Sequence, residues 1–276
     1  MYHAKKLGSN NFQYFTEHMN EKAQAKLKLE NAVKQAHTMR EFVGYYQPII
    51  HCQTGQVAGF EMLMRWPSEG SMIPPDVFIP VAEDIGLIED MTAQLIEQAI
   101  PMLKTTQWQQ SGLYLSVNLS ALHISKSVKV DEIVNLLREH DIPTSAIRFE
   151  ITESALMSDY EAAMQAIASM KDKGFVIALD DFGTGYSSLK YLKDFPIDIL
   201  KIDKSFVKDI GLNSANEGII LAILRMAESL NIDCVAEGIE TEAQVSFFKA
   251  QGCEYLQGFY YSKPIPASEV LELHLK

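Results

Sequence analysis

Acidic and amide side chains recur at the ends of short apolar segments in this 276-residue chain. They are Glu61, Asn118, Glu150, Asp180, Asp181, Glu237 and Gln257, and Lys201 occupies an equivalent place. Five or more carboxylates do not gather unaided, because two unit charges about 4 Å apart repel by roughly 4 kcal/mol at an effective dielectric constant near 20. If these side chains meet, some of them must be protonated or cations must lie among them.

The residue types favour Mg²⁺ or Mn²⁺ over zinc. None of the seven His residues forms an i, i+4 pair, and the three Cys residues are scattered. Carboxylate and amide oxygens suit Mg²⁺ or Mn²⁺, and the adjacent Asp180 and Asp181 suggest a carboxylate that bridges two ions. Two metals a few ångströms apart hydrolyse phosphodiesters, and Lys201 could hold the attacking water or offset charge.

These residues belong to eight segments that we expect to be strands. After about Arg40 the chain alternates β-rich runs with segments of helical period, which indicates a parallel sheet with helical crossovers. The expected strands are 42–50, 57–66, 113–118, 147–152, 175–180, 198–202, 233–236 and 254–258. Their number and spacing favour an α/β fold of the TIM-like (β/α)₈ barrel type over an open sheet, and such a barrel would gather the polar set at one mouth.

The first connection differs from the others. Only residues 51–56 separate the first two expected strands, which is too short for the crossover that parallel strands require. We therefore expect the first strand to run antiparallel to the second.

Composition narrows the class of protein. A net charge of −12 would repel a nucleic-acid backbone, so no nucleic-acid partner is expected, although cations held by carboxylates could still admit a small anionic substrate. The three Cys residues include no CxxC pair, which fits a reducing cytoplasm. The start of the chain lacks the apolar core of a signal peptide, and no segment is expected to span a membrane.

Short runs along the chain, in order, resemble those of the EAL domain family. They are Tyr46-Gln47-Pro48-Ile49, Glu61-Met62-Leu63-Met64-Arg65-Trp66, Val117-Asn118-Leu119-Ser120, Glu150-Ile151-Thr152-Glu153-Ser154, Asp180-Asp181-Phe182-Gly183-Thr184-Gly185, Leu200-Lys201-Ile202-Asp203, Ala236-Glu237-Gly238-Ile239-Glu240-Thr241 and Gln257-Gly258-Phe259. Met62 stands where the motif that names the family has Ala. Its side chain should point away from Glu61, because side chains alternate along a strand.

The resemblance implies hydrolysis of cyclic di-GMP to linear pGpG, with two Mg²⁺ or Mn²⁺ ions and with Ca²⁺ inhibitory. The implied ligands are Glu61, Asn118, Glu150 and Asp180 for one ion, and Asp180, Asp181 and Glu237 for the other. Lys201 would contact the attacking water, and the implied catalytic set is Lys201, Glu61, Glu237 and Glu240. Gln47, Arg65, Asp203 and Gln257 would bind or shape the site for substrate, and Glu153 would anchor the loop 181–188.

Two other functions stay open. Some EAL domains bind cyclic di-GMP without cleaving it, and these typically lack metal ligands or the loop sequence, whereas both are present here. An unrelated metal-dependent lyase on the same barrel rests on fold analogy alone, and the order of the motifs speaks against it.

The first 39 residues differ in character from the rest. They are polar and charged, with Thr16 as an expected N-cap and a helical spacing of Met19, Ala23 and Leu27. Residues 4–15 resemble the end of a GGDEF domain, which implies that residues 1–39 are a remnant of that domain plus a linker helix and that residues 40–276 are the EAL barrel. The implied partners are a second copy, as a homodimer through the barrel, and upstream GGDEF or sensor domains in a parent protein that could be membrane-attached.

Overall fold

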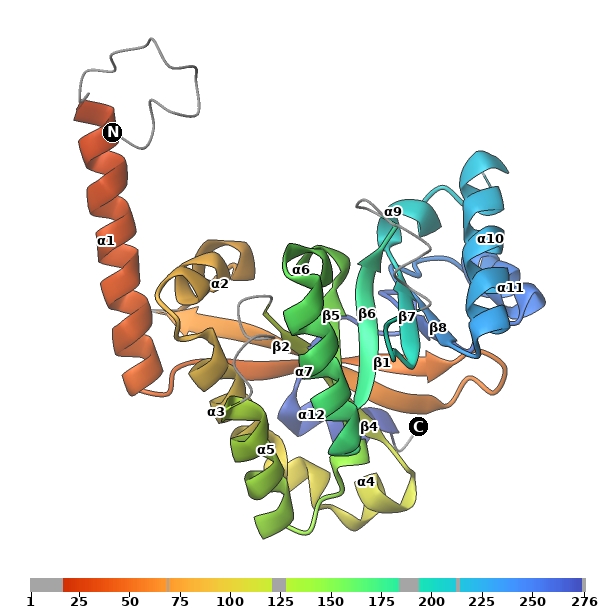
Figure 1. Ribbon diagram of the computed structural model, residues 1–276, viewed down its shortest axis with the longest axis horizontal. Coiled ribbons are helices and arrows are strands. Elements are labelled where there is room, and N and C mark those ends of the chain that lie inside the picture. Colours follow the sequence, from red (N-terminus) through yellow and green to blue (C-terminus); the bar gives the residue numbers. More distant parts are fainter. Residues whose placement is uncertain (1–16, 69, 121–127, 184–193, 212–213, 275–276) are drawn as a thin grey trace.

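An eight-stranded barrel forms the centre of the computed structural model, which describes residues 17–68, 70–120, 128–183, 194–211 and 214–274 (Figure 1). Hydrogen bonding runs from β1 through β2, β4, β5, β6, β7, β8 and β9 and returns to β1, so the sheet is closed. The barrel strands are β1 Val43–His51, β2 Val57–Ser68, β4 Tyr114–Leu119, β5 Ile147–Thr152, β6 Val176–Phe182, β7 Ile199–Ile202, β8 Asp233–Ala236 and β9 Tyr255–Gln257. All eight expected strands, and with them the TIM-like barrel, are confirmed.

The first strand runs opposite to both of its barrel neighbours. β1 is antiparallel to β2 and to β9, whereas the other barrel strands pair in parallel. The link between β1 and β2 is a tight turn, in which Gly55 N donates to His51 O and His51 N donates to Gln56 O, each at 2.8 Å. Gly55 has a φ of 72°, which a residue without Cβ adopts easily. The predicted hairpin is confirmed.

Two short strands extend the sheet beyond the barrel. β3 (Ser71–Ile73) pairs with the far end of β2, and β10 (Ile265–Pro266) pairs with β1 at Tyr45 and Tyr46. Neither was expected from the sequence. Two or three residues are too few to display the alternation by which a strand is detected.

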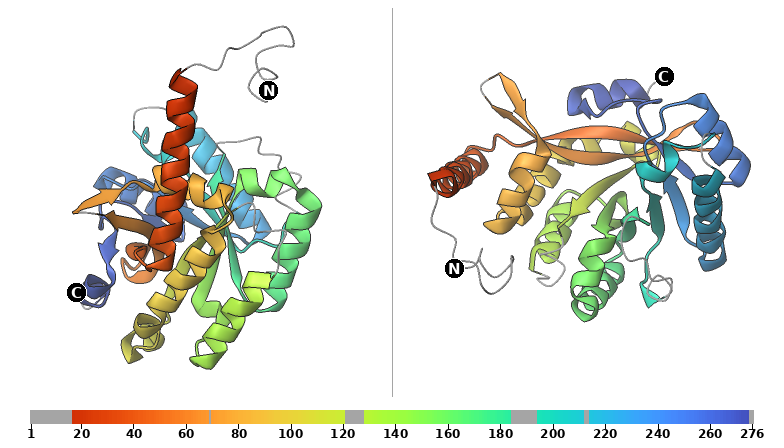
Figure 2. Two further views of the ribbon diagram at one scale, coloured as in Figure 1. Left: turned by 90° about the vertical axis from the view of Figure 1, so that its left-hand side faces the viewer. Right: turned by 90° about the horizontal axis from the view of Figure 1, so that it is seen from above.

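Helices cover the outside of the barrel, as two further views show (Figure 2). They are α1 Glu17–Thr38, α2 Pro75–Asp84, α3 Ile88–Leu103, α4 Thr106–Gln110, α5 Val128–Glu139, α6 Glu153–Ser158, α7 Tyr160–Asp172, α9 Lys204–Val207, α10 Ser214–Leu230, α11 Glu242–Gln251 and α12 Ala267–His274, with a 3₁₀ turn, η3, at Thr144–Ala146. Within the described ranges, none of these helices combines the length and the apolar character that crossing a bilayer requires.

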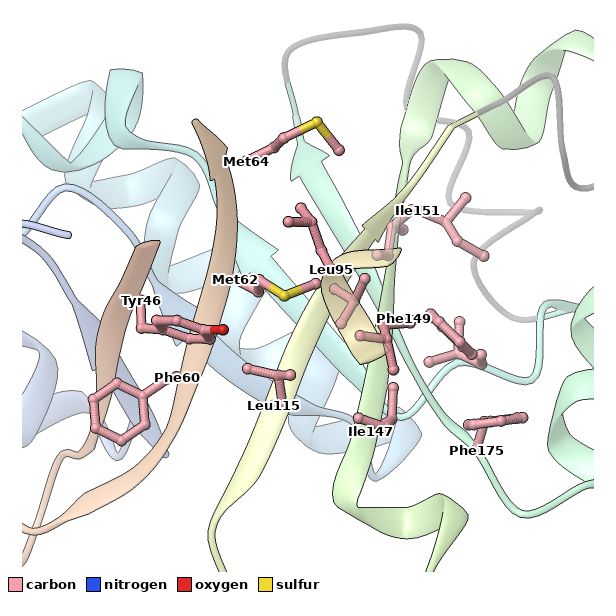
Figure 3. Packing of buried hydrophobic residues seen from close by; sticks show 14 of the residues in the cluster. Tyr46, Phe60, Met62, Met64, Leu95, Leu115, Ile147, Phe149, Ile151 and Phe175 are labelled. Carbon is pink, nitrogen blue, oxygen red and sulfur yellow. The ribbon is translucent and has the colours of Figure 1, made fainter. Parts of the chain in front are cut away.

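The main core lies between the strands and these helices (Figure 3). Phe60, Leu115 and Phe149 are fully buried there. Met62 belongs to the same layer and is 4% exposed. It therefore points away from the barrel interior, as the alternation along the strand predicted.

A second apolar cluster closes the floor of the barrel interior. It consists of Ile49, Tyr114, Ala178, Ile199 and Val235, which come from five different strands. A Cβ at Gly59 would lie 2.6 Å from the Tyr114 ring, so only glycine leaves room for that ring. On the parallel strands that carry members of this cluster, the polar residues predicted for the site follow those members, so they lie toward the carboxyl ends of these strands.

The helix expected before the barrel is present as α1. Val33 and Ala36 in its last turns are buried in the main core, while Leu27 is 57% exposed. Lys26 pairs with Asp84 of α2 at 2.7 Å. The division of the chain after residue 39 stays a prediction, and Thr16 and the GGDEF-like residues 4–15 lie outside the described residues.

Candidate active site

Lys201 lies at the centre of a layer of polar side chains in the barrel mouth, called the carboxylate layer below. Its acidic members are Glu61, Glu150, Asp180, Asp181 and Glu237. Lys201 is on β7, is 1% exposed, and places its Nζ 2.6 Å from Glu150 Oε2 and 2.7 Å from Glu237 Oε1. Asp180 Oδ1 and Glu61 Oε2 lie 3.4 and 3.7 Å away. Burial lowers the pKa of this amine, but the four surrounding carboxylates outweigh that effect and raise its pKa well above the ordinary value. Lys201 is therefore an ammonium that donates hydrogen bonds.

Glu61 is held from two sides by amide groups. Asn118 Nδ2 donates to Oε1 at 2.8 Å, and Gln257 Nε2 donates to Oε2 at 2.6 Å. Burial alone would raise the pKa of Glu61, yet the Lys201 charge and these hydrogen bonds lower it below its ordinary value. With Nδ2 turned to Glu61, the Oδ1 atom of Asn118 remains as the oxygen that could bind a metal.

Gln257 reaches this position because β9 passes very close to the loop after β8. A Cβ at the next residue, Gly258, would lie 2.1 Å from Ile239 O, so no side chain fits there. Gln257 is buried, and its Nε2 also donates to Gln47 Oε1 at 3.3 Å. Among the described residues no group donates to its buried Oε1.

Glu150 divides its two carboxylate oxygens between two partners. Oε2 faces Lys201, while Oε1 accepts a hydrogen bond from Ser116 Oγ at 2.5 Å. Burial, followed by repulsion from Glu61, raises the pKa of Glu150 well above its ordinary value. Ser116 was missed in the sequence, although it lies two residues before Asn118 and so faces the same side of β4.

Asp180 and Asp181 both reach the mouth because β6 is irregular there. The register between β6 and β7 shifts between Leu179 and Phe182, and Asp181 adopts a φ of 55°. In a regular strand two consecutive side chains point to opposite faces, so this irregularity is what permits both carboxylates to contribute. Asp181 N donates to Asp180 Oδ1 at 2.9 Å.

Asp180, Asp181 and Glu237 together form a set suited to a cation. One carboxylate oxygen of each lies within 4.8 Å of those of the other two. Burial and repulsion from Asp180 and Glu61 raise the pKa of Glu237 to about 8 despite Lys201, and burial followed by repulsion from Asp180 raises the pKa of Asp181. Carboxylates that gather to bind cations repel one another when no cation is bound, and this repulsion raises their pKa values.

The donor chemistry fits hard divalent ions. The layer offers carboxylate and amide oxygens, and no described His or Cys joins the acidic set. The buried Oε1 of Gln257 beside this layer needs a donor, which a hydrated ion or a substrate would supply.

The residues predicted to bind substrate besides Gln257 have their own partners outside the carboxylate layer. Gln47 donates from Nε2 to Ser262 O at 3.2 Å, and Arg65 is half-buried on the same face of β2 as Glu61, with its Nη1 donating to Met64 O at 2.9 Å. Asp203 is buried and caps α9, because Ser205 N donates to its Oδ1 at 2.9 Å. Their roles in binding substrate stay predictions.

Glu153 and Glu240 have opposite surroundings. Glu153 is 6% exposed, and Gly183 N donates to its Oε2 at 3.3 Å, a contact at the start of the loop that Glu153 was expected to anchor. Residues 184–188 of that loop lie outside the described residues. Glu240 is exposed, and in the described part of the chain its carboxylate has no hydrogen-bond or ion-pair partner. Its catalytic role stays a prediction.

Fold and site together define a class: a (β/α)₈ barrel that carries, at its C-terminal mouth, a carboxylate set suited to divalent cations around one enclosed lysine. A family model described as "EAL domain" matches residues 30–264, so the chain belongs to the EAL domain family.

Relatives and solved structures agree with this family. The "Bifunctional diguanylate cyclase/cyclic di-GMP phosphodiesterase MucR" of Pseudomonas aeruginosa is 39% identical over 276 residues, which cover 98% of this chain and 40% of that protein. The solved structure "PaMucR Phosphodiesterase, c-di-GMP complex" is similar with a TM-score of 0.81 at 37% identity, covering 88% of this chain and 99% of that chain. The cAMP and cyclic-di-GMP bound form of the EAL enzyme Bd1971 gives a TM-score of 0.85 at 30% identity, covering 98% and 72%.

The chain spans less than half the length of the relatives it matches. It covers 40% of MucR and 35% of the "Cyclic di-GMP phosphodiesterase NbdA" of the same organism, which is 33% identical over 275 residues. More than half of each of these two relatives therefore lies outside the matched region.

Proposed function

We propose that this chain is a phosphodiesterase that hydrolyses cyclic di-GMP to linear pGpG with the aid of two divalent cations, Mg²⁺ or Mn²⁺. The observation that carries the proposal is the set of Asp180, Asp181 and Glu237 within 4.8 Å of one another, next to an enclosed lysine. The chain is similar to solved EAL structures with cyclic di-GMP bound, at 37% and 30% identity. This similarity supports cyclic di-GMP as the substrate.

The residues that would hold the ions form two groups that share one member. Glu61, Asn118, Glu150 and Asp180 would hold the first ion, and Asp180, Asp181 and Glu237 the second. When bound, the ions supply an activated water and neutralise charge on the phosphoryl oxygens. In the reaction the water oxygen bonds to one phosphorus, the P–O3′ bond breaks, and the 3′ oxygen leaves as a hydroxyl with a proton.

The side chains of the layer supply orientation and charge. Lys201, whose pKa the four surrounding carboxylates raise, would donate to the attacking water or to the charge that develops. Glu61 is fixed by Asn118 and Gln257 on opposite oxygens, so its carboxylate is presented in one orientation. Arg65 and Gln47 would contact the guanine-phosphate part of the substrate.

The second candidate is an effector module that binds cyclic di-GMP without cleaving it. Product analysis distinguishes the two: the protein is incubated with cyclic di-GMP and either Mg²⁺ or Mn²⁺, and the nucleotides are separated by chromatography. Linear pGpG is expected with both ions and not with EDTA. Tight binding by calorimetry without product under any metal would establish the effector function instead.

Calcium provides a control within the same experiment. It is larger and less demanding of octahedral geometry than Mg²⁺, so it should occupy the site and support hydrolysis poorly. Excess Ca²⁺ should inhibit the Mg²⁺-supported reaction. A Ca²⁺-saturated protein that is as fast as the Mg²⁺ form would argue against the assigned ligand set.

Further features follow from the family resemblance and stay predictions. They are homodimerisation through the barrel, an upstream GGDEF or sensor domain, and a cytoplasmic location. Size-exclusion chromatography with light scattering, with and without metal, tests the first of these directly.

A further inference from the structure

The buried hydroxyl of Ser116, on the inner wall of the barrel, contacts Glu150. Ser116 lies on β4 and is 2% exposed, and its Oγ donates to Glu150 Oε1 at 2.5 Å. That length is typical of a hydroxyl bonded to a carboxylate. In the register between β4 and β5, Asn118 pairs with Glu150 and Ser116 pairs with Arg148. Ser116 is therefore a diagonal neighbour of Glu150 on the inner wall, and its hydroxyl reaches Oε1.

This contact distinguishes the two oxygens of Glu150. Oε1 is bonded to Ser116, whereas Oε2 lies 2.6 Å from Lys201 Nζ and faces the other carboxylates. The terminal torsion of a glutamate is broad, so a single contact on one oxygen does not fix the plane of the carboxylate. Two contacts from different strands, one on each oxygen, do fix it.

Space filling does not explain a serine at this position. Alanine occupies nearly the same volume, and a buried hydroxyl is unfavourable unless it is hydrogen-bonded. Among the described residues, Ser116 Oγ makes no other side-chain hydrogen bond. Its chemical contribution is therefore the bond to Glu150.

We propose that Ser116 is a positioning residue of the site: its hydroxyl holds Oε1 of Glu150 and so presents Oε2 to the cation. The inference rests on the proposed metal-dependent function. Groups that orient a metal ligand in this way typically contribute tenfold to a hundredfold in metal affinity or activity.

The test compares Ser116→Ala with Ser120→Ala, a matched control. Ser120 Oγ donates to Glu83 Oε1 of α2, also at 2.5 Å, and neither residue belongs to the proposed metal ligands. Mn²⁺ binding is measured by calorimetry without nucleotide, and kcat and KM for cyclic di-GMP are measured as functions of Mn²⁺ concentration. Circular dichroism and the thermal midpoint in EDTA report on folding.

The expected result is a Mn²⁺ affinity about ten to a hundred times weaker in Ser116→Ala, with KM for cyclic di-GMP at saturating Mn²⁺ close to that of the wild type. Ser120→Ala should bind Mn²⁺ like the wild type. Ser116→Thr retains a hydroxyl and should recover affinity relative to the alanine variant.

Three results would overturn the proposal. One is a folded Ser116→Ala protein with wild-type Mn²⁺ affinity and kcat, another is an equal loss in Ser120→Ala, and the third is a wild type that binds no divalent ion. Failure of the proposed function alone has a different signature: wild type would bind Mn²⁺ but form no pGpG, while the affinity difference between wild type and Ser116→Ala would persist.

Discussion

Lys201 Nζ and Glu237 Oε1 lie 2.7 Å apart and join the ends of β7 and β8 inside the barrel mouth. The lysine is fully enclosed, and its Nζ also lies 2.6 Å from Glu150 Oε2. Removing one partner of a buried ion pair leaves the other charge uncompensated. The Lys201 ammonium therefore stabilises the buried carboxylates around it, in addition to its proposed role in the chemistry.

Lys201→Ala should lose at least about a hundredfold in kcat, the scale typical of one positioned catalytic or electrostatic group. Its contribution is expected mainly in the transition state, so binding of cyclic di-GMP should persist. Steady-state kinetics with Mg²⁺ and calorimetric titration with Ca²⁺ check both parts. Lys171→Ala, which removes a partly exposed partner of Asp198, is the control. A Lys201→Ala protein that cleaves as fast as wild type would refute the role of Lys201, although the phosphodiesterase proposal would survive.

Asp180→Asn should abolish hydrolysis while leaving the fold largely intact. Asp180 is the one residue assigned to both metals, so loss of its charge weakens both sites. Mn²⁺ binding by calorimetry should fall together with product formation, and circular dichroism should be unchanged. Asp84→Asn, on the surface of α2, is the matched substitution and should remain active. Activity equal to wild type in Asp180→Asn would contradict the bridging assignment.

The metal-free protein should lose stability as pH rises through about 8. Burial and repulsion by neighbouring carboxylates raise the pKa of Glu237 from 4.5 to about 8, so the folded state holds this proton more tightly than the unfolded chain. The stability linked to the protonated carboxyl is fully present below pH 4.5 and is lost across the interval up to about 8.

Thermal midpoints in EDTA at pH 6 and pH 9 measure this linkage. Glu237→Gln carries no titrating group at this position and should show a smaller difference between the two pH values than wild type. Saturating Mn²⁺ should also reduce the difference, because a bound cation favours the ionised carboxylate. Equal pH dependence in wild type and Glu237→Gln would show that Glu237 does not carry the effect.

Arg65→Ala should weaken binding of cyclic di-GMP by about 1.5 to 3 kcal/mol if the guanidinium makes a charge-assisted bond to phosphate. The loss should appear mainly in KM, because such a contact acts equally in the ground and transition states. Arg138→Ala on α5, an exposed arginine, serves as the control. A change confined to kcat would point to a different role for Arg65.

Much of the architecture was predictable because it depends on local pattern. The eight barrel strands follow from alternation and spacing, and the antiparallel β1 follows from the length of one short link. Period-2 alternation also places Met62 in the outer core and Glu61 inside. The polar residues at the strand ends could therefore be assigned to one mouth from the sequence alone.

The geometry within that mouth was decided by the tertiary structure. Asp180 and Asp181 break the alternation of side chains along β6, so a period of two cannot assign both to one face. This irregularity coincides with a register shift between β6 and β7 and with the positive φ of Asp181. The bond from Ser116 to Glu150 depends on the register between β4 and β5.

The residue types that reach the barrel mouth could be read from the amino-acid order alone, because strand period and chain order are local properties. The enclosure of Lys201 by four carboxylates and the exposure of Glu240 emerge only from the folded arrangement of the chain. Burial, and the pKa shifts that follow from it, depend on segments far apart in the chain, such as those that carry Glu61 and Gln257.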